Sequence, residues 1–198
     1  MRPVENGRNS TLKKMTNSTL HNLVKFLETA GRLKRTLRAG WIGVGIRQPE
    51  SVADHTFRTA ILCMIYADMK GLDQPKMLRM ALIHDLPEAI IGDLTPSKKT
   101  KESKDKENAA INQILGLLPE TQKKKFLTDW NEYQEGKTKE AKAVRQLEKL
   151  EMALQAKEYE KAKTTDHSLK RFIKSAEKAI TSPELRRLLS CILEEQQQ

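Results

Sequence analysis

Two histidines and one aspartate are the residues of this 198-residue chain best suited to metal chemistry. His55 and His84 each lie among apolar residues, and Asp85 directly follows His84. A single histidine on an apolar helix face is usually a hydrogen-bonded core residue, but two of them with an adjacent carboxylate favour a site. Imidazole and carboxylate together suit a divalent ion of intermediate softness. We therefore predict one divalent transition metal (Co, Mn, Zn, Fe or Ni, with Mg as an alternative).

The local geometry around His84 predicts the end of a helix. Neighbouring residues of a regular helix point about 100° apart, so His84 and Asp85 could not both face one ion from its interior. Placed at a helix end, both side chains can converge. Pro87, which disfavours a continuing helix, indicates such an end.

Two further carboxylates follow in the same stretch. Glu88 comes shortly after Asp85, and Asp93 follows Gly92. The apolar residues at 89–91 indicate that both carboxylates are partly buried. Burying a charge without a partner is costly, so a cation or a substrate nearby would explain them.

Two more stretches are ambiguous by themselves. Glu148, Glu151 and Gln155 form a polar stripe at i, i+3, i+7, which either faces the site or is ordinary solvated surface. Arg38 and Trp41 begin a glycine-containing loop, and a tryptophan there either lines a pocket or closes the edge of the core. The residues alone leave both questions open.

The elements that must position these side chains are predicted to be helices. Lys, Glu, Ala and Leu dominate, aromatic residues are 5% of the chain, and the apolar residues recur at helical spacing. We expect an all-α helical bundle of about 7–9 helices in a single domain over residues 17–195, after a flexible extension over residues 1–16. Caps and breakers predict these helices: one starting after Asn17 or Ser18, 51–70, one from Asp73, one ending near 118, 119–136, 138–161, 168–180 and 183–193. Pro87 either ends the helix from Asp73 or starts a short helix that stops at Gly92.

Helical periodicity also predicts which faces are buried. The first helix would bury Leu20, Leu23, Val24, Leu27, Ala30 and Leu33. The second would bury Ala60, Ile61, Met64 and Ile65. Phe126, Leu127, Trp130 and Tyr133 share one side of a later helix, as core or as a self-association face. Cys63 and Cys191 are expected to be core residues in a reducing compartment.

The formal net charge is +10, from 36 Lys and Arg against 26 Asp and Glu. A basic balance fits an anionic partner, but the lysines are spread over helix surfaces, so we favour solvated lysines over nucleic-acid binding. No apolar run approaches the roughly 20 residues that a membrane span needs. We expect a cytoplasmic protein without membrane or nucleic-acid partners.

The motifs together resemble a known family. His55, then His84-Asp85, then an acidic residue on a later helix is the pattern of the HD-domain metal phosphohydrolases. Residues 49–55, 81–93 and 148–160, with the loop at 38–41, are similar to the 5′-deoxynucleotidases of that group in particular. The resemblance covers roughly residues 20–190. It implies the HD-domain helical bundle, and an enzyme that removes the 5′-phosphate from deoxyribonucleoside 5′-monophosphates as a homodimer.

The resemblance also implies roles for individual residues. His55, His84 and Asp85 would be metal ligands, and Glu148 stands where the family has an aspartate as the fourth ligand. Glu88 would act as an acid/base or water-orienting group. Asp93 would contact the sugar and be a second catalytic residue beside Glu88, and Arg38 and Trp41 would contact the nucleotide.

Two alternatives compete with this function. One is another HD phosphohydrolase that acts on deoxynucleoside triphosphates, cyclic nucleotides or (p)ppGpp. Binuclear members use further histidines, and only His21 and His167 remain here, so we favour one metal. The other is a catalytically impaired HD protein that binds nucleotide or nucleic acid, which the glutamate at 148 and the net charge would support.

Overall fold

The computed structural model describes residues 16–95, 98 and 100–194. These residues form ten α-helices and one short 3-10 helix, and no β-strand occurs among them. Eight of the α-helices have ten or more residues, and α2 and α5 have four each. The all-α prediction is therefore confirmed. The expected N-terminal extension lies outside the described residues, apart from Thr16.

The helices occupy the following segments: α1 (Asn17–Gly31), η2 (Arg32–Lys34), α2 (Ala39–Ile42), α3 (Val52–Lys70), α4 (Gln74–Ile83), α5 (Glu88–Ile91), α6 (Lys101–Leu115), α7 (Glu120–Glu135), α8 (Lys139–Lys161), α9 (Lys170–Ala179) and α10 (Pro183–Glu194).

Local sequence signals set most of these boundaries. Ser51 and Asp54 form a capping box at the start of α3, and Gly71 ends that helix in the left-handed conformation with φ 62°. Asp73 caps α4 by accepting a hydrogen bond from the backbone N–H of Lys76. The cap of α1 is Thr16, slightly earlier than predicted, because its side chain accepts from the N–H three residues on.

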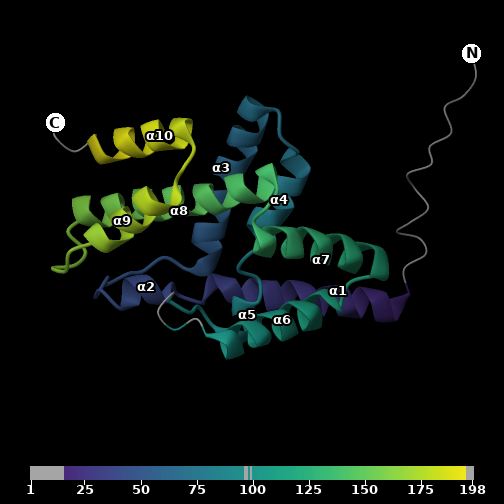
Figure 1. The fold of residues 1–198 in the computed structure, drawn as a ribbon. Helices are drawn as coiled ribbons and strands as arrows, with labels where there is room; N and C mark the ends of the chain where they lie inside the picture. Colours follow the sequence, from purple (N-terminus) through teal and green to yellow (C-terminus); the bar gives the residue numbers. More distant parts are fainter. Residues whose placement is uncertain (1–15, 96–97, 99, 195–198) are drawn as a thin grey trace, which may run out of the picture.

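Three neighbouring helices form the centre of the bundle. α3 packs against both α4 and α8, and α4 also packs against α8. α9 and α10 pack on α8, while α5 packs on α6 and on α1. Figure 1 shows α8 crossing α3, with α1, α5 and α6 grouped below. Because α3, the end of α4 and α8 carry the candidate ligands, this packing determines where those ligands meet.

The buried face of α1 differs from the prediction. Of the residues predicted to be buried, Leu20, Val24 and Leu27 are exposed, whereas Ala30 and Leu33 pack in the core as predicted, together with Phe26. In the described part of the chain, α1 packs against η2, α5 and α6, and this packing leaves Leu20, Val24 and Leu27 exposed. Periodicity identified an apolar face, but packing decided that this face stays outside.

α3 also faces the core with a different side than expected. Phe57, Ile61, Met64, Ile65 and Met69 are exposed and form a stripe that we call the α3 stripe. α3 approaches α4 and α8 at once, and small side chains allow this close approach. The large residues Ile61, Met64 and Ile65 are exposed, so the prediction was wrong for them. Ala60 is buried as predicted, together with the small residues Thr56, Thr59, Cys63 and Ala67.

Two other expectations are settled by packing. Trp130 and Tyr133 of α7 are buried, and Phe126 and Leu127 pack against the core, so this face is core and not a self-association surface. Cys191 is exposed, contrary to prediction, because α10 buries only the opposite side of the helix against α8. In the part of the chain that the structure describes, no helix is long and apolar enough to cross a membrane.

Candidate metal centre

His84 and Asp85 lie where α4 ends, as the sequence predicted. α4 stops at Ile83, and His84 is its buried C-cap residue. The Nδ1 atom of His84 lies 2.7 Å from the carbonyl oxygen of Ala81. Since a carbonyl only accepts, Nδ1 carries a proton, and Nε2 is the nitrogen that faces the centre. Nε2 is buried and has no hydrogen-bond partner, and it lies 3.2 Å from Asp85 Oδ2.

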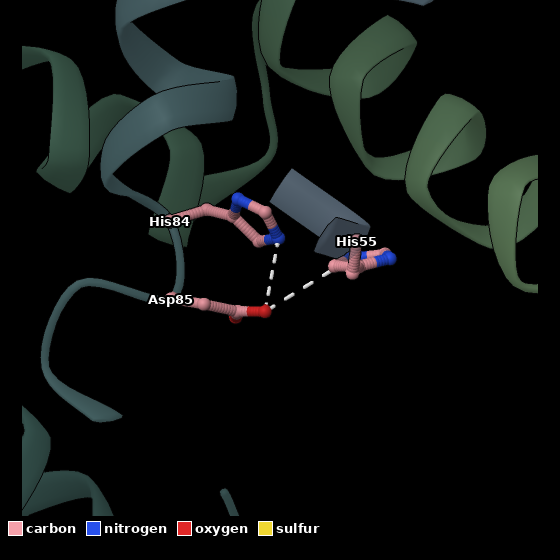
Figure 2. A group of neighbouring side chains, drawn as sticks. All are labelled: His55, His84 and Asp85. Carbon is pink, nitrogen blue, oxygen red and sulfur yellow. Dashed lines mark ion pairs between the residues drawn. The ribbon is translucent and has the colours of Figure 1, made fainter. Parts of the chain in front are cut away.

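His55 approaches the same point from the first turn of α3. Its ring is buried, and its Nδ1 atom contacts Oε2 of Glu151 on α8. Because Arg58 donates to the other oxygen of Glu151, we assign Glu151 as the ionised acceptor and Nδ1 as the donor, which leaves the lone pair of His55 on Nε2. Figure 2 shows both imidazoles beside the Asp85 carboxylate, whose Oδ2 lies 4.0 Å from His55 Nε2.

The three side chains fit a divalent ion. His55, His84 and Asp85 each offer one ligand atom, all within 4.8 Å of one another. Two ligands about 2.1 Å from a common ion lie roughly 3.0–3.4 Å apart, depending on the coordination angle. The observed separations of 3.2 and 4.0 Å need only small adjustments. The unsatisfied Nε2 of His84 is the clearest single sign that this cluster suits a cation.

Glu148 stands beside these three ligands. Its Oε2 lies 3.6 Å from His84 Nε2 and accepts a hydrogen bond of 2.5 Å from the hydroxyl of Tyr133. Its Oε1 lies 3.1 Å from Lys149 Nζ. Burial raises the pKa of Glu148, but Lys149 and His84 outweigh it and lower the pKa to about 2. The carboxylate is thus ionised and held next to the centre.

The charges of the cluster favour a bound cation. Burial raises the pKa of Asp85, but His84 and Arg38 outweigh it and hold that pKa well below its usual range. Burial lowers the pKa of His55, so this ring is neutral at pH 7. Burial also acts to lower the pKa of His84, but Asp85 and Glu148 more than offset it, and the pKa is raised. The point between these groups therefore attracts positive charge.

Arg38 connects this cluster to Asp93. One guanidinium nitrogen, Nη1, lies 3.1 Å from Asp85 Oδ2 and 3.9 Å from Asp93 Oδ1. Oδ2 of Asp93 accepts a 2.5 Å hydrogen bond from the N–H of Ala39, the first residue of α2. Burial acts to lower the pKa of Arg38, but the carboxylates of Asp85 and Asp93 outweigh it, so the guanidinium remains charged.

Trp41 is buried at the edge of the core and also lines the cavity described below, so it combines the two predicted roles. Its ring packs on Phe172, with centroids 4.0 Å apart, and meets Tyr159 edge-on. Its indole N–H donates to Glu50 Oε1 at 2.8 Å. The packed ring is almost wholly covered, since 2% of the residue is accessible.

One cavity of about 670 Å³ connects the candidate residues. All eight residues singled out in the sequence line it, namely Arg38, Trp41, His55, His84, Asp85, Glu88, Asp93 and Glu148. Their individual roles remain predictions, but the structure brings them together at one place.

Sequence reasoning missed several neighbours of the centre. Tyr133 looked like one member of an apolar helix face, yet its hydroxyl binds Glu148. Lys149 lines the cavity, and no spacing signal distinguished it from the other lysines. Glu151 was part of the polar stripe on α8, and the structure resolves that ambiguity because Glu151 is 0% exposed. Arg58 pairs with Glu151, but nothing in its sequence context marked it.

Comparison with known proteins agrees with this geometry. Residues 30–186 match the HD domain family. The 5′-deoxynucleotidase HDDC2 of Xenopus laevis is 40% identical over 176 residues, which cover 88% of this chain and 87% of that protein. The chain belongs to the HD-domain 5′-deoxynucleotidase family. The human 5′-deoxynucleotidase HDDC2, another member, is 39% identical over 171 residues, covering 85% of this chain and 83% of the relative.

A solved structure supports the fold of this family member. The conserved hypothetical protein from Pyrococcus furiosus superposes with a TM-score of 0.71 at 34% identity, covering 86% of this chain and 98% of the other. The single HD domain expected from the sequence is therefore confirmed.

Proposed function

We propose that this HD-domain protein is a metal-dependent phosphohydrolase that removes the 5′-phosphate from deoxyribonucleoside 5′-monophosphates. The observation that carries the proposal is the convergence of two imidazole nitrogens and one ionised carboxylate at the wall of a cavity that also holds a buried arginine. The 5′-deoxynucleotidase relatives point to the same substrate class.

His55, His84 and Asp85 would hold the ion, with Glu148 as the fourth ligand. A divalent ion in this place would supply Lewis-acid chemistry, polarising phosphoryl oxygens and making a water more acidic. The donor set of nitrogen and oxygen atoms fits Co, Mn, Fe, Ni or Zn better than Mg.

Arg38 would bind the phosphate beside the ligands. Its guanidinium adjoins Asp85, and its planar array of donors matches the oxygens of a phosphate group. A phosphate that reaches the centre is thereby held between the ligands and a fixed positive charge. This contact would orient phosphorus for attack by water.

Glu88 would move the protons of the reaction. It is buried at the start of α5 and lines the cavity. As water attacks, a new oxygen–phosphorus bond forms and the bond to the 5′-oxygen breaks. Glu88 would take a proton from the water and return one to the leaving oxygen, which gives a deoxynucleoside and inorganic phosphate.

Asp93 and Trp41 would contact the nucleoside. Both line the cavity, and Asp93, whose Oδ1 lies 3.9 Å from Arg38 Nη1, also accepts a hydrogen bond from the first residue of α2. Because Trp41 is only 2% exposed, we expect it to limit the space beside the sugar rather than to stack on a base.

The α3 stripe is where we would place a homodimer contact. Contiguous exposed apolar residues mark interaction surfaces, and a two-fold axis would bring the same stripe of a second copy against it. A homodimer in the cytoplasm remains our expectation for the working state of the protein.

The decisive experiment measures phosphate release by protein stripped of metal and then given Co, Mn, Zn or Mg separately. The substrates are the four common deoxynucleoside monophosphates and their ribose counterparts. We expect metal-dependent release from the deoxy compounds, abolished by Asp85→Asn. The matched control is Asp105→Asn, on the exposed side of α6 and outside the cavity.

Other outcomes would redirect the proposal. No release with any metal or monophosphate would overturn it. Turnover of triphosphates or cyclic nucleotides would then identify a different HD phosphohydrolase. Nucleotide binding without any turnover would identify a binding protein.

A further inference from the structure

Glu151 is a buried carboxylate that contacts the candidate ligand His55 on the side of the ring that faces away from the centre. It lies on α8, is 0% exposed and uses both of its oxygens. Oε2 contacts His55 Nδ1, on the opposite side of the ring from the centre. Oε1 accepts a 2.9 Å hydrogen bond from Nε of Arg58.

Arg58 is itself held in place by α8. Its Nη1 donates to Glu158 Oε1 at 2.6 Å, and its Nη2 donates to Gln155 Oε1. Glu151, Gln155 and Glu158 recur at i, i+4, i+7 and so share one face of α8. One guanidinium from α3 thus binds three residues of α8 at the crossing of these helices.

The two histidines of the centre are oriented by different means. His84 Nδ1 donates to the backbone carbonyl of Ala81, which no substitution removes. His55 Nδ1 depends on the side chain of Glu151, ninety-six residues away. The orientation and tautomer of His55 can therefore be tested by substitution, whereas those of His84 cannot.

We propose that Glu151, braced by Arg58, is a positioning residue that fixes the His55 tautomer with its Nε2 lone pair toward the metal. This inference rests on the metal site of the proposed function. Partners that accept the second N–H of a ligating histidine orient the ring and raise its basicity, and losing one typically costs 10–100-fold in metal affinity.

A second metal between Glu50, His55 and Glu151 is the competing explanation, because these three also group closely. His55 Nδ1 and Glu151 Oε2 are already in direct contact, however, and an ion between them would need about 2 Å to each atom. The positive charge of Arg58 on the same carboxylate further disfavours a cation there. The contact is therefore a hydrogen bond that orients the ring.

The informative substitution is Glu151→Gln, which keeps the size of the side chain. A glutamine has one acceptor oxygen, and Arg58 can only donate. If that oxygen faces Arg58, the amide N–H groups face His55 Nδ1, which must then accept. The ring proton moves to Nε2 and blocks the ligand position.

The test titrates metal-stripped protein with Co²⁺ in competition with a chelator, and records the visible spectrum of bound Co²⁺. We expect one equivalent bound by the natural protein and binding 10–100-fold weaker in Glu151→Gln. Glu158→Gln is the matched control, since it removes an outer partner of the same arginine and leaves His55 untouched. We expect it to change affinity by less than about threefold.

The outcomes separate this inference from the proposed function. Absence of Co²⁺ binding by the natural protein would count against the metal site itself. Unchanged affinity in Glu151→Gln, or two equivalents bound by the natural protein, would overturn the positioning role alone. If circular dichroism shows that Glu151→Gln does not fold, Arg58→Met provides the second test. We expect it to bind Co²⁺ more weakly. Unchanged Co²⁺ binding would refute the positioning of Glu151 by Arg58.

Discussion

Replacing Glu148 with the shorter aspartate tests whether this glutamate is a metal ligand. The substitution removes one methylene and withdraws the carboxylate by about 1.5 Å, the length of a carbon–carbon bond. Oε2 now lies 3.6 Å from His84 Nε2 and 2.5 Å from the Tyr133 hydroxyl. After a retraction of that size, the contact with Tyr133 would exceed the roughly 3.0 Å limit of an O–H···O hydrogen bond.

The structure gives a magnitude for Glu148→Asp. A hydrogen bond to a charged group contributes about 1.5–3 kcal/mol, and a buried hydroxyl would be left without its partner. For a chain of this size that loss lowers Tm by roughly 3–12 °C. If Glu148 is the fourth ligand, a bound metal would lose that ligand or would require the site to distort, so we expect Co²⁺ affinity at least tenfold weaker.

Thermal unfolding and chelator competition measure these two effects separately. Tyr133→Phe is the control, because it removes the same hydrogen bond and leaves the reach of Glu148 unchanged. It should lower Tm similarly and weaken Co²⁺ binding much less. Equal or tighter Co²⁺ binding in Glu148→Asp, or faster phosphate release, would refute the reasoning and show that the natural glutamate impairs the centre.

Three further predictions concern the surroundings of the centre. Arg38→Lys keeps the charge but loses the fork beside Asp85 and Asp93, and we expect kcat/KM for deoxynucleoside monophosphates to fall about 10–100-fold in steady-state assays. Burial and Glu151 raise the pKa of Glu50 from 4.5 to about 8. Between these pH values the folded protein keeps a proton on Glu50 that the unfolded chain releases. The stability that Glu50 contributes therefore falls as pH rises through this range. In urea unfolding of the metal-free protein, Glu50→Gln should reduce the fall of the unfolding free energy with pH by up to about 1.4 kcal/mol per pH unit between pH 5 and 8. An unchanged slope would contradict the pKa shift of Glu50. A Phe57→Glu substitution in the α3 stripe should convert a dimer to a monomer by light scattering, and a dimer that persists would exclude this surface.

Short-range physics made the helix boundaries and the ligand motif predictable. Ser51 caps α3 through its own neighbours, Gly71 ends that helix because glycine tolerates φ 62°, and Pro87 marks the break after α4. His84 and Asp85 are adjacent at that break, so their convergence followed from helix geometry. These signals act within a few residues and need no knowledge of the fold.

The faces of the helices were not predictable in the same way. α3 is apolar on more than one side, so periodicity could not tell Ile61, which is exposed, from Cys63, which is buried. The choice depended on α4 and α8, which approach α3 closely over its small residues. Which apolar side is covered is a property of the packed bundle.

The sequence by itself determined that this protein is an all-α member of the HD-domain 5′-deoxynucleotidase family, and which eight residues to examine, because these depend on local motifs and their order. Only the tertiary structure decided that Glu151 faces His55, that Tyr133 holds Glu148 and that Arg38 bridges Asp85 toward Asp93. Apart from the Tyr133 contact, these interactions join residues separated by tens of positions. They exist because the crossing of packed helices brings distant side chains within hydrogen-bonding distance, which no local pattern encodes.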